Sequence, residues 1–162
     1  MTPWFPTYHA ALCDAVAEGL ESGAAVRVRA GGASMRPLLR DGEEVRIVPA
    51  RAEAIRVGDI VLVRTKGGAA LHRVIAIDAR AATLRTKGDG ERMADGALPL
   101  GAVVGRADAV LRHGRWVPLD TPVRRLLGRA VCGLLSPRDS LRAAARALIR
   151  AKAALSTNRG AD

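Results

Sequence analysis

The segment Ile60–Ile77, IVLVRTKGGAALHRVIAI, shows the strand pattern that recurs along much of this chain. Two apolar runs, Ile60–Arg64 and Ala70–Ile77, lie on either side of the turn dipeptide Gly67-Gly68. Runs of about four to eight residues that are rich in β-branched side chains and bounded by glycine are typical of strands. The segment therefore predicts two short strands joined by a turn.

The same pattern extends in both directions, from Ala25 to about Pro118. Turn dipeptides such as Asp41-Gly42 and His113-Gly114 separate the apolar runs. The further candidate strands are Ala25–Arg29, Glu44–Val48, Ala82–Thr86, Ala102–Leu111 and Arg115–Val117. Because no helical pattern interrupts this series, we expect an antiparallel or mixed β-domain.

Helical patterns lie at the two ends of the chain. Apolar residues recur at helical spacing from about Tyr8 to Glu21, before Ser22-Gly23. After the strands, Pro122–Leu135 predicts one helix, and Ser136-Pro137 has the residue types of an N-cap and a first helical position for a second. The expected fold is therefore α+β: a mainly β core with an N-terminal helix and two C-terminal helices.

We expect a single domain over residues 1–162, with three segments. Residues 1–23 form the N-terminal helical segment, 24–120 the β core, and 121–162 a basic helical extension. The net charge of +10 is +3 in residues 1–120 and +7 in residues 121–162. We interpret the basic helices first as solvated or packing elements and second as a peripheral membrane contact. Nucleic acid is the last choice, because aromatic side chains for base stacking are few.

The composition excludes several classes of protein. Apolar residues make up 49% and charged residues 26%, which fits a folded domain. No run of about 18 apolar residues predicts a membrane span, and no secretory signal pattern begins the chain. Cys13 and Cys132 are too few for a disulfide framework, and with His9, His72 and His113 they show no metal-binding spacing. We therefore expect no metal and no cofactor.

The segment Gly31–Pro37, GGASMRP, is the first candidate for chemistry. A serine in a glycine-rich turn before a proline can expose its hydroxyl beside backbone N–H groups. A serine nucleophile also needs a base within hydrogen-bond reach and donors for the developing oxyanion. By itself, Ser34 is more typical of a turn or a capping residue than of a catalytic nucleophile.

Five blocks in this order resemble the signal peptidase I superfamily. They are Ser34-Met35-Arg36-Pro37, Val57-Gly58-Asp59-Ile60-Val61, His72-Arg73-Val74-Ile75, Thr86-Lys87-Gly88-Asp89 and Val103-Val104-Gly105-Arg106. The resemblance covers about Val26 to Arg106, half of the chain. It implies a mainly β catalytic fold with mixed or antiparallel sheets, and the activity of a serine peptidase.

The resemblance also implies roles for single residues. Ser34 is the nucleophile, and His72 is the base, as in the archaeal and endoplasmic-reticulum branch of the superfamily rather than the lysine branch. Asp95 follows the Thr86-Lys87-Gly88-Asp89 block at the distance of the branch's orienting carboxylate, so we favour it over Asp89. Asp89 is then expected to organise the turn beside the site. For either aspartate the alternative is a solvated turn acid, since each precedes a glycine.

Gly32 and Met35 are the supporting candidates. Gly32 stands where members of the superfamily often carry a serine that assists the oxyanion hole, so the Ser34 backbone N–H is left as the obvious donor. Loss of one donor costs about 2.7–4 kcal/mol of transition-state stabilisation. The sequence thus predicts a slow or specialised enzyme.

The predicted function is that of a serine endopeptidase that cleaves a leader, signal or precursor peptide through an acyl-enzyme. The peptide is expected to bind extended beside a strand, and the protein to be cytoplasmic or peripheral to a membrane. One alternative is a self-cleaving repressor-type regulator, although only about 30 residues precede the serine block and those repressors use lysine. The other is a non-catalytic peptide-binding module on the same fold.

Overall fold

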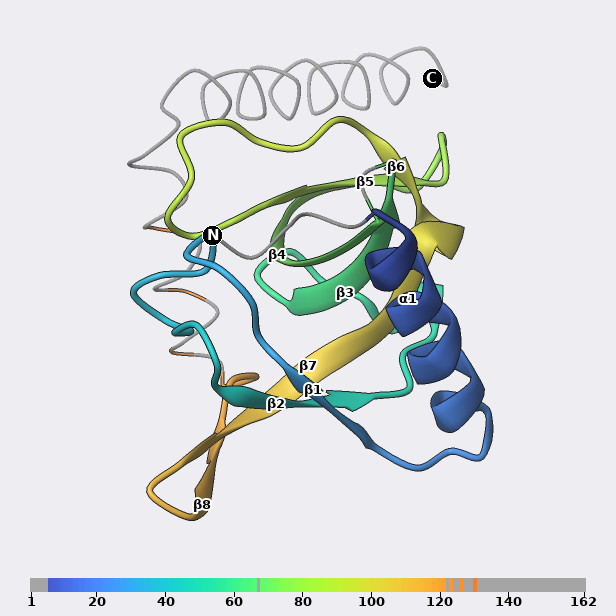
Figure 1. Ribbon diagram of the computed structural model, residues 1–162. Coiled ribbons are helices and arrows are strands. Elements are labelled where there is room, and N and C mark those ends of the chain that lie inside the picture. The colour runs from blue at the N-terminus through green and yellow to red at the C-terminus, as the bar shows by residue number, and fades with distance from the viewer. Residues whose placement is uncertain (1–5, 67, 122, 124–125, 127–129, 131–162) are drawn as a thin grey trace, which may run out of the picture.

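The computed structural model describes residues 6–66, 68–121, 123, 126 and 130 (Figure 1). Among them, one α-helix precedes eight strands and two short 3₁₀ helices. The elements are α1 (Pro6–Glu21), β1 (Val26–Arg29), β2 (Glu44–Val48), η1 (Ala52–Ala54), β3 (Ile60–Thr65), β4 (Gly68–Asp78), β5 (Thr83–Lys87), β6 (Leu98–Pro99), η2 (Leu100–Ala102), β7 (Val103–Arg112) and β8 (Arg115–Pro118).

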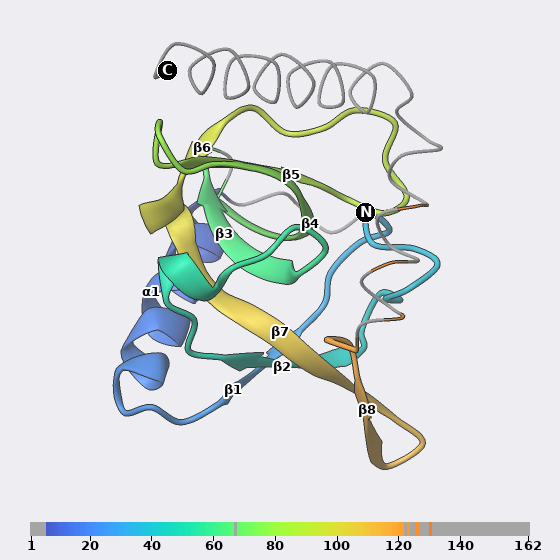
Figure 2. The same ribbon diagram turned by 180° about the vertical axis from the view of Figure 1, so that it is seen from behind.

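The eight strands form one antiparallel sheet in the order β1-β2-β7-β3-β4-β5-β6, with β8 also paired to β7. The ten-residue β7 connects the two halves of this sheet, because it pairs with β2, β3 and β8. Register shifts interrupt its pairing at Arg46/Ile47 in β2 and at Leu62/Val63 in β3. Such irregularities bend and twist strands. Figures 1 and 2 show β7 crossing the molecule diagonally toward the β8 hairpin.

The predicted α+β class is wrong: in the described part of the chain the structure is mostly antiparallel β-sheet with a single α-helix. The two C-terminal helices expected over 122–135 and from 136 onward lie almost wholly outside the described residues. Each expected strand is found within two residues of its predicted ends, and β6 is an addition. The class prediction failed because it gave terminal amphipathic patterns the weight of structural layers, whereas strand pairing builds almost all of the described fold.

Helix α1 covers one face of the sheet. Its side chains Val16 and Leu20 are buried in a core cluster with residues of β2 and β7, such as Ile47. The helix approaches β7 closely at Gly105, where an added Cβ would lie 2.8 Å from Leu20 Cδ1 and 2.6 Å from Ile47 Cγ2. Strand β3 is apolar on both faces, and its Val61 and Val63 enter a second, smaller cluster. No helix in the described part of the chain has the length and apolar character that crossing a membrane requires.

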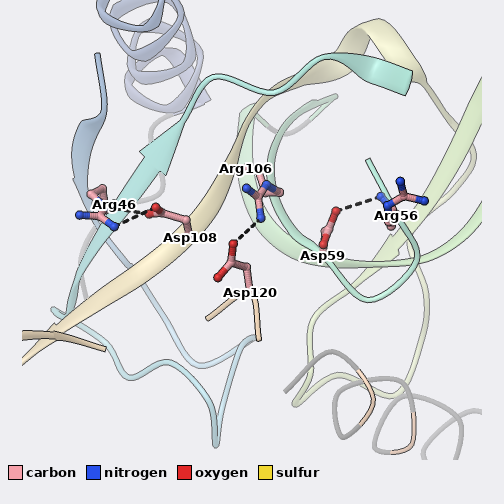
Figure 3. A network of polar contacts seen from close by, with 6 residues as sticks. All are labelled: Arg46, Arg56, Asp59, Arg106, Asp108 and Asp120. Atoms are coloured by element: carbon pink, nitrogen blue, oxygen red, sulfur yellow. Dashed lines mark hydrogen bonds and ion pairs between the residues drawn. The ribbon is translucent and has the colours of Figure 1, made fainter. Parts of the chain in front are cut away.

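Ion pairs brace the sheet on its more exposed side (Figure 3). Arg46 of β2 makes a bidentate contact with Asp108 of β7, with nitrogen–oxygen distances of 2.8 and 2.9 Å. Arg106 of β7 contacts Asp120 at 2.9 Å. The arginine-rich composition is therefore used in part to link neighbouring strands and the segment after β8.

Candidate active site

The loop between β1 and β2 carries Ser34. The backbone N–H of Gly32 donates a 2.8 Å hydrogen bond to Asp41 Oδ1 across this loop, and Gly32 has a φ of +80° that favours glycine. Met35 is buried in the larger core cluster and fixes the middle of the loop to the body of the protein. The half-buried Ser34 is thereby held between two anchored neighbours on the wall of a cavity.

Strand β4 places two neighbouring polar residues on opposite faces of the sheet, because successive side chains of a strand alternate. His72, paired in register with Val61 of β3, lines the cavity. Arg73 points to the other side and makes a bidentate ion pair with Asp89, at 2.7 and 2.6 Å. The Arg73 guanidinium also donates to the Gly58 carbonyl at 2.8 Å. Both partners of this ion pair are buried.

Asp95 contacts the ring of His72. The distance between Asp95 Oδ2 and His72 Nδ1 is 2.7 Å. The buried Thr86 hydroxyl donates to the same carboxylate oxygen, and the Asp95 backbone N–H donates to the Thr86 carbonyl at 2.9 Å. A carboxylate on Nδ1 favours the tautomer with the proton on that nitrogen, which leaves the lone pair of Nε2 available to act as a base.

The loop between β5 and β6 packs directly on the β1–β2 loop that carries Ser34, here called the serine loop. The Gly90 N–H donates to the Ser34 carbonyl at 2.7 Å. At Gly88 an added Cβ would lie 2.5 Å from the same carbonyl oxygen, so only glycine permits this approach. Since this loop also carries Asp95, its packing brings Ser34 to the same region as His72 and Asp95.

A cavity of about 1500 Å³ lies where these segments meet. Ser34, His72 and Asp95 all line it, although in the described part of the chain no hydrogen bond joins the Ser34 hydroxyl to His72. Catalytic hydrogen bonds commonly tighten only when substrate is bound. Much of the wall is apolar, and the larger apolar residues on it include Leu12, Val28, Met35, Leu39, Leu62 and Leu71.

The charges at this site oppose the effect of burial. Burial is the largest single influence and lowers the pKa of His72, but the hydrogen bond and charge of Asp95, with the charges of Glu91 and Asp89, outweigh it and raise that pKa. Burial likewise acts to raise the pKa of Asp95, but hydrogen bonds from His72 and Thr86 leave that pKa below its ordinary value. The two groups therefore stabilise each other's charged forms.

Four of the candidate residues named from the sequence have contacts that separate their roles. Asp95 contacts His72, whereas Asp89 is engaged by Arg73 on the other face of β4. The Gly32 N–H donates to Asp41, and Met35 is a core residue. The structure thus assigns a contact to each of the two aspartates that sequence reasoning left as alternatives.

Sequence reasoning missed three residues of this region. Thr86 and Arg73 belong to blocks already quoted for the resemblance, and the alternation along β4 could have separated Arg73 from His72. Glu91 had no sequence signal, yet its Oε2 lies 3.8 Å from His72 Nε2. His72, Glu91 and Asp95 together offer three possible metal-ligand atoms within 4.8 Å of one another.

Comparisons of the chain with protein-family models, with curated proteins and with solved structures found no match. The functional interpretation therefore depends on the residues and their geometry.

Proposed function

We propose that the chain is a serine endopeptidase with Ser34 as nucleophile, His72 as general base and Asp95 as the carboxylate that orients it. One observation carries the proposal: Asp95 holds His72 Nδ1 at 2.7 Å on the wall of a cavity that Ser34 also lines. An oriented imidazole beside a serine is the arrangement that acyl transfer requires.

The chemistry follows from these positions. Ser34 Oγ attacks the scissile carbonyl carbon while its proton passes to His72 Nε2. The tetrahedral intermediate then collapses to an acyl-enzyme, and the imidazolium gives the proton to the leaving amine. Water, activated by the same imidazole, releases the acyl group and restores Ser34. Because the Gly32 N–H is engaged by Asp41, we assign the Ser34 N–H as an oxyanion donor.

The surroundings of the cavity support an extended peptide as substrate. Strand β1 has β2 as its one partner in the described sheet, and its residues Val28 and Arg29 line the cavity. An unpaired strand edge can bind a peptide in β conformation through main-chain hydrogen bonds. The resemblance to signal peptidase I adds the expectation of a leader or precursor peptide with small side chains near the scissile bond.

A fluorophosphonate probe and a library of unstructured peptides test this proposal. We expect the probe to label the wild-type protein but not S34A. The control S22A, which removes an exposed serine outside the site, should be labelled like the wild-type protein. H72A and D95N should be labelled much more slowly. Equal labelling of S34A would refute the assignment of the nucleophile.

The peptide library separates the alternatives. Peptides that bind the unchanged protein without being cleaved, combined with no labelling, would overturn catalysis in favour of a peptide-binding module. Cleavage of the chain itself, seen as a mass change that S34A prevents, would instead indicate the self-cleaving regulator.

A further inference from the structure

Glu91 occupies a position that the proposed peptidase chemistry does not use. Its carboxylate lies 3.8 Å from His72 Nε2, whereas Asp95 contacts Nδ1 of the same ring, and the three groups offer ligand atoms within 4.8 Å of one another. The Glu91 backbone N–H donates to the Gly88 carbonyl at 3.1 Å, and its side chain passes over Gly88, where an added Cβ would lie 3.0 Å from Glu91 Cγ. The carboxylate is thus directed toward Nε2 by the turn that precedes it.

The ring of His72 has the surroundings of a metal ligand. A histidine that binds a metal through one nitrogen usually donates its other N–H to a carboxylate, which fixes the tautomer and the ring. Asp95 supplies that second contact on Nδ1 at 2.7 Å, and Thr86 supports Asp95 in turn. Nε2 is then the nitrogen whose lone pair is available, and Glu91 is the acid beside it.

The separation of the two ligand atoms suits one zinc ion. Zinc binds histidine nitrogen and carboxylate oxygen at about 2.0–2.2 Å, so two ligands at a tetrahedral angle lie roughly 3.4 Å apart. The observed 3.8 Å between Nε2 and Oε2 needs only a small movement of the Glu91 side chain, which is 41% exposed. Imidazole with carboxylate also favours zinc over the harder magnesium and calcium ions.

We infer that His72 Nε2 and Glu91, which both line the cavity, form a zinc-binding site with Asp95 as the outer carboxylate and water in the remaining positions. Zinc on Nε2 occupies the lone pair that would accept the Ser34 proton. The ion is therefore a reversible inhibitor rather than a cofactor. Zinc binding does not depend on the proposed peptidase function, whereas inhibition by zinc rests on that function.

Titration calorimetry of the whole protein with zinc chloride tests the binding. We expect E91Q to bind zinc at least tenfold more weakly, H72A to show no binding at this site, and S34A to bind as the unchanged protein does. D95N should lose roughly 10–100-fold in affinity, which is the usual effect of removing an outer-shell partner. Magnesium chloride at the same concentrations should give no binding.

Matched variants identify binding elsewhere on the surface. Glu53 and His113 are exposed and lie outside the cavity lining, so E53Q and H113A should leave the zinc affinity unchanged. Because the Glu91 side chain is 41% exposed, we expect E91Q to fold, and unchanged zinc affinity in this variant would overturn the site. So would loss of binding in H113A.

The inhibition has its own readout. Zinc should block probe labelling of the unchanged protein but have at least tenfold less effect on E91Q. If zinc binds and E91Q weakens it, but Ser34 is never labelled, the metal site stands and the peptidase assignment fails. If labelling proceeds normally while zinc is bound, the inhibitory role is wrong.

Discussion

Replacing Asp89 by asparagine should destabilise the protein strongly, although Asp89 does not contact His72. Its carboxylate makes a bidentate ion pair with Arg73 at 2.7 and 2.6 Å, and the two side chains are only 4% and 1% exposed. Asparagine has nearly the same shape but no charge, so D89N leaves the Arg73 guanidinium buried without its counter-charge. Removing one partner of a buried pair costs about 3–5 kcal/mol.

Urea unfolding followed by far-ultraviolet circular dichroism measures this loss as a free energy, and thermal unfolding followed by the same signal measures it as a change in Tm. For a protein of this size, 1 kcal/mol corresponds to about 2–4 °C in Tm, so D89N should lower Tm by roughly 6–20 °C. The matched control is D108N, which breaks the Arg46–Asp108 pair of Figure 3. Those side chains are 37% and 18% exposed, and pairs near the surface contribute about 0–1 kcal/mol.

Two results would contradict the role assigned to burial of the Arg73–Asp89 pair. A loss below about 1 kcal/mol in D89N would show that Arg73 finds other compensation, contrary to the cost of burying a single charge. A loss in D108N as large as that in D89N would show that burial does not separate the two pairs. Replacing both partners, as R73M/D89L, should recover part of the loss, since no charge then remains buried.

The remaining predictions concern the site. G88A should lose about 1–3 kcal/mol of stability and much of its probe labelling, because the added Cβ would collide with the Ser34 carbonyl. G31A should lose neither, because an added Cβ at Gly31 would meet no atom within 4 Å. Unfolding curves that coincide for the two variants would contradict the packing of the two loops. D95N should lower kcat/KM on a cleaved library peptide by about 10⁴ while changing stability far less than D89N; retained activity would exclude Asp95 as the orienting group. T86V should lower kcat with little change in KM, because it removes the hydroxyl that holds the carboxylate, and T86S should restore the rate if the hydroxyl is responsible. Activity should fall as pH drops through the raised pKa of His72, since the base must be neutral, and in D95N this fall should move to lower pH; an unmoved profile would refute the coupling. The contribution of the His72–Asp95 pair to stability should be lost as pH rises through the raised His72 pKa and as pH falls through the lowered Asp95 pKa. It should therefore be largest between about pH 4 and 6.5. Urea unfolding of the wild-type protein and of D95N at several pH values measures this contribution.

Strand positions could be predicted because their signals are local. β2 was predicted at Glu44–Val48 and is found there, since five alternating residues bounded by turn residues carry their own pattern. The two-residue β6, Leu98–Pro99, has no such pattern and exists because it pairs with β5. The fold class could not be predicted equally well, because it depends on how the elements assemble rather than on the pattern of each one.

In the candidate site, too, the sequence indicates candidate residues but not which of them are in contact. Asp89 and Asp95 both precede a glycine, so as turn dipeptides they look alike in the sequence. The order of the blocks selected Ser34, His72 and Asp95 as candidates for chemistry. It also favoured Asp95 over Asp89 as the acid beside the histidine, but no distance supported that choice.

Local sequence patterns suffice to predict the strands and the glycines of the turns, and the amino-acid sequence contains the residue types that acyl transfer needs. The contacts between these residues are visible only in the folded chain: Asp95 contacts His72 Nδ1, Asp89 contacts Arg73, and Glu91 lies near His72 Nε2. These contacts join residues that are 16 to 23 positions apart in the chain. Such contacts depend on which face of β4 each side chain occupies and on how closely the β5–β6 loop packs against the serine loop, and neither can be derived from local sequence patterns.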